Sequence, residues 1–399
     1  MNKKRIAGAC AAAIAAMAFI GCAKTKSGGS VKVGILHSIT GTMAMSERAV
    51  RDAEMLAIKE INEAGGVLGK KIKVVEEDGQ SSPSVFAEKA RKLLQKDEVA
   101  AVFGCWTSAA RKAVKPVFEE LYGLLWYPVQ YEGLEASPNI MYMGATPNQQ
   151  VIPAIDYCAK RFGKRMALIG SDYVFPKAVN KIIKAQLDSL GGSCVMEKYV
   201  PLGQTDFSGI VEEIRSLSPD VIINTMNGDS NIHFFRRISG GNTTPLTIPT
   251  MNFSVAESEI AAIGTENTRG AFVSWGYFDG EDDGKSFAEK YRKAYGEERV
   301  TSDPIASGYI AVHLWAKACE KAGTFDVEAV RIAAKGLSAE TPCGNVTIDG
   351  SNQHLYRNSK IGVVNGDGHM EEVWSSKSPI KPDPYLSTYG WARGMYCGI

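Results

Sequence analysis

The sequence predicts an α/β fold made of two lobes, each built on a doubly wound parallel sheet. Three observations predict it. The chain has 399 residues, which is too long for one ordinary core and suits two lobes of about 100–200 residues each. Short apolar runs alternate with amphipathic helical patterns over residues 31–127, and the same alternation begins again over residues 148–275. The repeat is one of architecture, because no sequence repeat accompanies it.

The N-terminal segment has the pattern of a bacterial export signal and is set aside before the fold is considered. A basic Lys3-Lys4-Arg5 precedes an apolar stretch at residues 6–20, which is too short to span a membrane comfortably. Residues 1–21 resemble a lipoprotein signal peptide, whose cleavage leaves Cys22 as a lipidated N-terminus. Residues 22–30 are then expected to form a flexible tether. A plain secretory signal is the alternative, and either one places the mature protein outside the cytoplasmic membrane.

The first array alternates strands and helices. Strands are expected at residues 31–36, 71–76, 99–103 and 124–127, and helices at residues 50–61, 86–95 and 109–114. The first helix has Val50, Ala53, Ala57 and Ile61 on one stripe, which is typical of a helix packed on a sheet. The strands are short and apolar, as in a parallel sheet buried on both faces.

The second array follows the same scheme. Strands are expected at residues 165–170, 194–199, 219–225, 247–251 and 271–275, and helices at residues 148–161, 178–190, 207–217 and a segment ending at 238. Three later helices at 285–295, 305–322 and 327–337 precede strands at 344–349, 359–364 and 370–374. Late helices after the second array indicate that the chain returns to the first lobe. The expected lobes are residues 31–147 plus 278–343, and residues 148–277 plus 344–399.

Composition and motifs give little sign of catalysis. The net charge is +1, so nothing draws the whole chain toward nucleic acid. The sequence has no G-x-S-x-G, H-E-x-x-H or C-x-x-C motif, and we therefore expect neither an enzyme nor a metal or cofactor site. After Cys10 and Cys22, six cysteines remain, and the sequence does not choose a disulfide pairing among them. They are Cys105, Cys158, Cys194, Cys319, Cys343 and Cys397.

Aromatic and amide side chains recur where the expected strands end. The loop after residues 99–103 carries Trp106 and Ser108 ahead of a helix, and in a parallel sheet such loops hold ligands. The other side chains in equivalent positions are Tyr127, Gln130, Tyr173, Asn227, Asp229, Asn252 and Tyr277. Their occurrence in both arrays predicts a cleft between the lobes for a small ligand. Because few of them are charged, the ligand is expected to be neutral or only partly charged.

Several motifs resemble a known family. INEAGGVLG at residues 61–69, followed by Asp78, looks like the type I periplasmic binding proteins of ABC importers, which are receptors for branched-chain amino acids and amides. Within that family, GCWTSAARKAV at residues 104–114 and YPVQYEG at 127–133 look like the urea-binding subgroup. The same subgroup is suggested by SPNI at 137–140, GSDYVFP at 170–176 and KPDPY at 381–385. A neighbouring subgroup binds short aliphatic amides.

The resemblance implies two lobes joined by three crossovers, which close on the ligand by a hinge motion. It implies that Trp106, Ser108, Tyr127 and Gln130 line the first-lobe half of the site. Residues Tyr173, Asn227, Asp229, Asn252 and Tyr277 would lie on the other lobe or at the hinge. The implied partners are the permease subunits of an importer and, through lipidated Cys22, a bacterial membrane.

The residue chemistry agrees with urea, which offers four N–H donors and one acceptor oxygen. Asp229 and the amides of Gln130, Asn227 and Asn252 would supply acceptors, and the loop N–H groups near Ser108 would take the carbonyl. Two alternatives stay open: a receptor or sensor for short amides or branched-chain amino acids, and an extracytoplasmic amidohydrolase. The second lacks a visible nucleophile–base pair.

Overall fold

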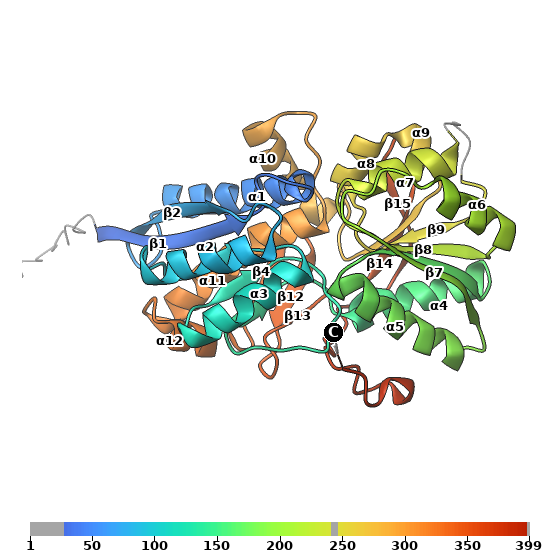
Figure 1. Ribbon diagram of the computed structural model, residues 1–399. Coiled ribbons are helices and arrows are strands. Elements are labelled where there is room, and N and C mark those ends of the chain that lie inside the picture. The colour runs from blue at the N-terminus through green and yellow to red at the C-terminus, as the bar shows by residue number, and fades with distance from the viewer. Residues whose placement is uncertain (1–27, 241–245, 397–399) are drawn as a thin grey trace, which may run out of the picture.

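The computed structural model describes residues 28–240 and 246–396, and these form two α/β lobes (Figure 1). The first lobe is built on a five-stranded parallel sheet in the order β2-β1-β3-β4-β5. Its strands are β1 (Gly28–His37), β2 (Lys70–Asp78), β3 (Val102–Gly104), β4 (Leu125–Tyr127) and β5 (Ile140–Tyr142). The predicted α/β class with parallel-sheet lobes is confirmed.

Helices pack on the first sheet through the apolar stripes seen in the sequence. They are α1 (Ala44–Glu63), α2 (Pro83–Gln95), α3 (Ser108–Glu120), α10 (Lys285–Tyr295), α11 (Asp303–Ala322) and α12 (Val327–Ala334). Val50, Ala53 and Ala57 on α1 are fully or almost fully buried. Helix α11 lies against α1, and a Cβ at Gly308 would lie 2.7 Å from Cγ1 of Val50. We therefore propose that the late helices belong to the first lobe.

The second lobe has a seven-stranded sheet in the order β15-β14-β10-β9-β8-β6-β7. Its strands are β6 (Arg165–Ser171), β7 (Ser193–Val200), β8 (Val221–Thr225), β9 (Thr250–Asn252), β10 (Phe272–Trp275), β14 (Lys360–Val364) and β15 (Met370–Ser375). Strands β14 and β15 are antiparallel additions at one edge, and the other strands are parallel. Its helices are α4 (Val151–Arg161), α5 (Val174–Ser189), α6 (Ser208–Leu217), α7 (Ser230–Ser239), α8 (Glu257–Ile263) and α9 (Thr265–Thr268).

A small antiparallel sheet contains β11 (Ser338–Thr341), β12 (Gly344–Ile348) and β13 (Leu355–Tyr356). Short 3-10 helices occur at Pro147–Gln149, Asp282–Gly284 and Gly390–Ala392. Val346 and Leu355 belong to the hydrophobic core of the first lobe, whereas the expected boundary assigned residues 344–399 to the second. We therefore propose that the last crossover lies between β13 and β14.

Three segments connect the lobes, and one buried ion pair touches all of them. Arg357, between β13 and β14, is paired with Asp303 and also donates to the carbonyl of Met143, which follows β5. The same Asp303 carboxylate accepts from the backbone N–H of Gly276 at 2.8 Å, just after β10. This contact fixes where the three crossovers meet.

The structure differs from the expected boundaries and strands at several places. Strand β1 begins at Gly28 and pairs with Lys70, so residues 28–30 are not part of a free tether. Strand β5 was not expected, because its apolar core is only three residues long. The signal peptide, Cys22 and Cys397 lie outside the described residues. No helix within residues 28–240 and 246–396 is long and apolar enough to cross a membrane.

Candidate ligand-binding site

The loop after β3 turns sharply and leads directly into α3. Gly104 has a φ of 142°, and a Cβ at this position would lie 2.0 Å from the backbone oxygen of Leu36. Only glycine fits such a close approach of the loop to β1. Thr107 then caps α3, because its Oγ1 accepts from the backbone N–H of Ala110 at 3.1 Å. Ser108 is thereby fixed in the first turn of the helix.

A buried ion network stands behind Ser108. The guanidinium of Arg111 donates from Nη1 to Oγ of Ser108 at 2.9 Å, from Nη2 to Glu132 at 2.8 Å and from Nε to Glu135 at 2.9 Å. The hydroxyl of Ser108 in turn donates to the Glu132 carboxylate. Burial opposes the charge on Arg111, but the two carboxylates outweigh it and hold the pKa of Arg111 well above its usual value. Arg111 is thus committed to neighbours within the first lobe.

Tyr127 lies between this network and the Trp106 loop. Its hydroxyl donates to the backbone oxygen of Trp106, and the Arg111 guanidinium lies 5.2 Å from the centre of its ring. Burial raises the pKa of Tyr127 above its usual range, so the phenol stays protonated. Tyr127 therefore fixes the position of the Trp106 loop through this hydrogen bond.

A second buried cluster lies at the end of β1. His37 Nδ1 lies 3.2 Å from Oε2 of Glu47, and its Nε2 lies 3.1 Å from Oε2 of Glu54. Burial opposes protonation of His37, but the charge of Glu54 and hydrogen bonds to both carboxylates raise its pKa to about 10. His37 is therefore an imidazolium at neutral pH. The backbone N–H of Ser38 also donates to Oε2 of Glu47 at 2.8 Å.

The two lobes meet through direct hydrogen bonds at the predicted residues. Nε1 of Trp106 donates to Oδ1 of Asn227 at 3.1 Å. Nε2 of Gln130 donates to the backbone oxygen of Phe253 at 2.9 Å and to Oγ of Ser254 at 3.0 Å. Trp106, Gln130 and Asn227 are each at most 4% exposed. The lobes are therefore in contact at the Trp106 loop and at the segment that follows β4.

Tyr173 comes from the second lobe, immediately before α5, and its ring stacks on Phe175 and packs against the core of that lobe. Its hydroxyl has no hydrogen-bond partner among the described residues. Burial, followed by the nearby Tyr127 and Glu132, raises its pKa well above the usual value, and Glu47 adds to this. The groups that influence Tyr173 electrostatically thus belong to the first lobe.

Two predicted residues are not part of this group. Asn252 accepts from Nδ2 of Asn224 at 2.8 Å and donates to the backbone oxygen of Phe272 at 2.7 Å, so its amide is used within the second sheet. The hydroxyl of Tyr277 pairs with Oγ1 of Thr301 at 2.8 Å, and its ring belongs to the first-lobe core. Both follow strand ends, as predicted, but their polar atoms are already occupied.

Asp229 lies just before α7, next to a point of lobe contact. Its Oδ1 is buried and has no hydrogen-bond partner among the described residues, and its side chain does not cap α7. A Cβ at the adjacent Gly228 would lie 2.7 Å from the backbone oxygen of Thr42 in the first lobe. The Oε1 atom of Gln130 is likewise buried without a partner. Unpaired acceptors of this kind carry a cost unless a donor reaches them.

The charged residues of the site were missed at the sequence level. Arg111 and Glu132 lie inside the two motifs that carry the family resemblance, and His37 follows the first strand. These three residues could therefore have been named as candidate site residues from the sequence. Glu47 and Glu54 gave none, because acidic residues on an amphipathic helix usually face water.

The described part of the chain offers no group of three or more metal-ligating side chains placed to hold a metal ion. The five cysteines that the structure describes are free thiols: Cys105, Cys158, Cys194, Cys319 and Cys343.

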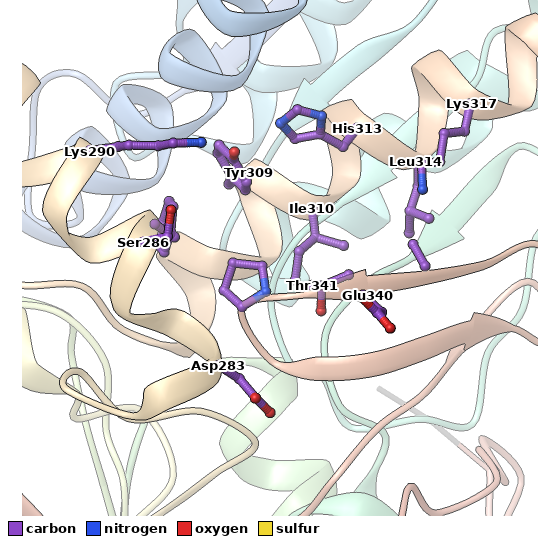
Figure 2. A pocket seen from close by; sticks show the side chains of 13 residues that line it. Asp283, Ser286, Lys290, Tyr309, Ile310, His313, Leu314, Lys317, Glu340 and Thr341 are labelled. Atoms are coloured by element: carbon purple, nitrogen blue, oxygen red, sulfur yellow. The ribbon is translucent and has the colours of Figure 1, made fainter.

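A separate cavity of about 390 Å³ opens on the first lobe, away from the lobe interface (Figure 2). Tyr309 and His313 on α11 line one side, and Lys290 on α10 lines another. Lys290 and Tyr309 are both bound to Glu60. Because none of the predicted site residues lines this cavity, it is not our candidate site.

The chain matches a known protein family. The model of the periplasmic binding protein domain family matches residues 31–390, and the chain belongs to this family. A Leu/Ile/Val-binding protein homolog of Brucella suis is 26% identical over 378 residues, covering 88% of this chain and 92% of that protein. The Leu/Ile/Val-binding protein BraC3 of Rhizobium johnstonii is 26% identical over 332 residues, covering 79% and 87%.

Solved structures share the fold. The substrate-binding protein LivJ of Streptococcus pneumoniae, in complex with isoleucine, is 21% identical with a TM-score of 0.76, covering 88% of this chain and all of that one. A solute-binding protein of Rhodopseudomonas palustris, in complex with 3,4-dihydroxybenzoic acid, is 23% identical with a TM-score of 0.78, covering 88% and 98%. The family match and the shared fold thus agree: the protein is a member of the periplasmic binding protein domain family, and its two-lobed fold is that of the solved solute-binding proteins.

Proposed function

We propose that this protein binds urea between its lobes and delivers it to the permease of an ABC importer. The observation that carries the proposal is the Ser108–Glu132 pair. Ser108 stands at the N-terminus of α3, where a ligand carboxylate would find backbone N–H groups. Its hydroxyl proton is directed to Glu132, and a buried carboxylate at this place repels an anionic ligand. The site therefore favours a neutral ligand.

The surrounding groups match a donor-rich planar molecule. Glu132 and Glu47 offer carboxylate acceptors, and the hydroxyl of Tyr173 is able to donate to a carbonyl oxygen. The rings of Trp106 and Tyr127 exclude water from the same region. A direct hydrogen bond between Trp106 and Asn227 joins the lobes, which suits a ligand of only a few atoms. Urea combines these properties.

A receptor for branched-chain amino acids is the second candidate, and the names of the relatives favour it. Such a ligand carries a carboxylate as well as an ammonium group. The guanidinium of Arg111 would be the natural partner of the carboxylate, but it is committed to Ser108, Glu132 and Glu135. A short aliphatic amide is the nearer alternative, because it shares the carbonyl and one amino group with urea.

Within this proposal the nine predicted site residues divide into two sets. Trp106, Ser108, Tyr127, Gln130 and Tyr173 are assigned to the site, together with Asn227 and Asp229. Asn252 and Tyr277 are assigned a supporting role, since their hydrogen bonds lie within the sheet and beside the hinge. Anchoring through a lipid on Cys22 completes the proposed function.

The proposal is tested by calorimetric titration of the mature chain with urea, acetamide and leucine. We expect saturable heat with urea, weaker binding of acetamide and no binding of leucine. Tight leucine binding without a urea signal would overturn the urea assignment in favour of the amino acid receptor. A preference for acetamide would move the ligand to the short amides.

A further inference from the structure

We infer that Glu47 is a specificity-determining residue, which accepts a hydrogen bond from the second amino group of a diamino carbonyl ligand. The inference rests on the proposed function and goes beyond it, because it names the group that separates urea from short amides. Neither the motifs nor the positions at strand ends pointed to Glu47, which lies in the first turn of α1.

The geometry leaves one carboxylate oxygen of Glu47 available. Its Oε2 atom receives both the Ser38 backbone N–H at 2.8 Å and Nδ1 of His37 at 3.2 Å. Its Oε1 atom has no hydrogen-bond partner in the part of the chain that the structure describes. The residue is only 1% exposed, yet Oε1 is not one of the enclosed atoms that lack a partner, so it keeps some access to solvent. A ligand that displaces solvent from Oε1 is bound well only if it supplies a donor.

The available oxygen belongs to the lobe interface. Oγ of Ser46, the residue before Glu47, donates to Oε1 of Glu259 in the second lobe at 2.6 Å. The loop that carries Trp106 is joined to the end of β1, because the Cys105 N–H donates to the Leu36 oxygen at 2.9 Å. Glu47 and Glu132, from α1 and from the segment after β4, are thus held near the carboxyl ends of the neighbouring strands β1 and β3, and both influence Tyr173 electrostatically.

Each carboxylate is paired with a cation. His37 stands behind Glu47 and is itself braced by Glu54, and Arg111 stands behind Glu132. An ionised carboxylate is only an acceptor. On the side turned away from their cations, Glu47 and Glu132 therefore accept hydrogen bonds from two donor groups and donate none. This arrangement suits a molecule that carries N–H groups on both sides of a carbonyl.

Urea and acetamide differ at this position. Acetamide has one amino group, and its methyl group would face the second carboxylate and leave that acceptor unpaired. A site that leaves a buried acceptor unpaired rejects the analogue strongly. Glu47 is therefore expected to set the preference, while Trp106 and Tyr127 contribute to binding of both molecules.

The test compares urea and acetamide binding to the full mature chain and to Glu47→Gln. Glutamine keeps the bonds to Ser38 and His37 through its oxygen and turns an NH₂ group toward the ligand. We expect the affinity for urea to fall by at least about tenfold, because the loss of one charge-assisted hydrogen bond lowers an affinity by about tenfold or more. The affinity for acetamide should fall by less than about threefold. Glu63→Gln, on the exposed end of the same helix, is the matched control.

The outcomes separate the two proposals. If the unaltered protein binds no urea, the proposed function and this inference both fall. If it binds urea but Glu47→Gln keeps the full preference over acetamide, the inference is overturned and the proposed function stands. Should Glu47→Gln fail to fold, Glu47→Asp decides, because it keeps the charge and withdraws the acceptor by one methylene. An unchanged preference in Glu47→Asp would then count against the inference.

Discussion

Close to the lobe interface the first lobe holds charged side chains that are paired with one another, whereas the second-lobe groups that bond across the interface to Trp106 and Gln130 are neutral. Glu47 and Glu132 are held by His37 and Arg111 within the first lobe. Across the interface stand an amide, a hydroxyl and a phenol, those of Asn227, Ser254 and Tyr173.

This difference indicates that the two lobes have different roles in ligand binding. Charged groups that are paired inside one lobe keep their positions whether or not the lobes are closed, so the first lobe is organised before the ligand arrives. The neutral second-lobe groups are less costly to expose to water when the lobes separate. We expect the ligand to meet the first lobe first and the second lobe to close over it.

The largest effect is expected when the cation of the first-lobe ion network is removed. Arg111→Met removes the guanidinium that pairs with the buried Glu132 and Glu135, and we expect a loss of about 3–5 kcal/mol in the free energy of unfolding. Urea binding should disappear as well. Chemical denaturation measures the effect. Lys112→Met is the control, since Lys112 also pairs with Glu135 but is one-third exposed, and a loss comparable to that of Arg111→Met would contradict the assignment.

The second prediction concerns pH. The pKa of His37 is raised to about 10 in the folded chain, so its contribution is fully present below about pH 6.5 and is lost as pH rises toward 10. We expect unfolding free energy to fall by roughly 2–4 kcal/mol over that range. His37→Gln should remove most of this slope, and Cys105, whose pKa burial also raises, accounts for part of the remainder. Parallel slopes for the two proteins would show that His37 is not charged.

The smallest predicted effect concerns the contact between the lobes. Trp106→Ala removes the bond to Asn227 and one wall of the site, and we expect urea affinity to fall at least about tenfold, or about 1.4 kcal/mol. Trp106→Phe keeps the ring and loses only the N–H donor, and it should cost less. Calorimetry measures both variants. Unchanged affinity in Trp106→Ala would remove this residue from the site.

The sequence predicted the periodic part of the fold well. The helical stripe of Val50, Ala53 and Ala57 and the short apolar strands locate α1 and the two sheets, because burial leaves its period in the chain. It did not predict β5, whose three apolar residues lie within a long loop. Nor did it place β12 with the first lobe, since a half-buried strand carries no sign of which core it joins.

The site was only partly predictable for a related reason. The end of a strand can be read from the sequence, but the direction of the side chain that follows cannot. Trp106 contacts the other lobe, whereas Asn252 and Tyr277, at similar positions, are used within the sheet and beside the hinge. Buried charges such as Glu47 are even harder to foresee, because their partners lie on another element and only the fold brings them together.

A crystal structure of the urea complex would test the central claim most directly. We predict that urea lies between the lobes, with one nitrogen within hydrogen-bond distance of Glu132 and the other within reach of Oε1 of Glu47. The carbonyl oxygen should face Tyr173 or the start of α3. Urea bound elsewhere, with both carboxylates contacting only His37 and Arg111, would contradict the account.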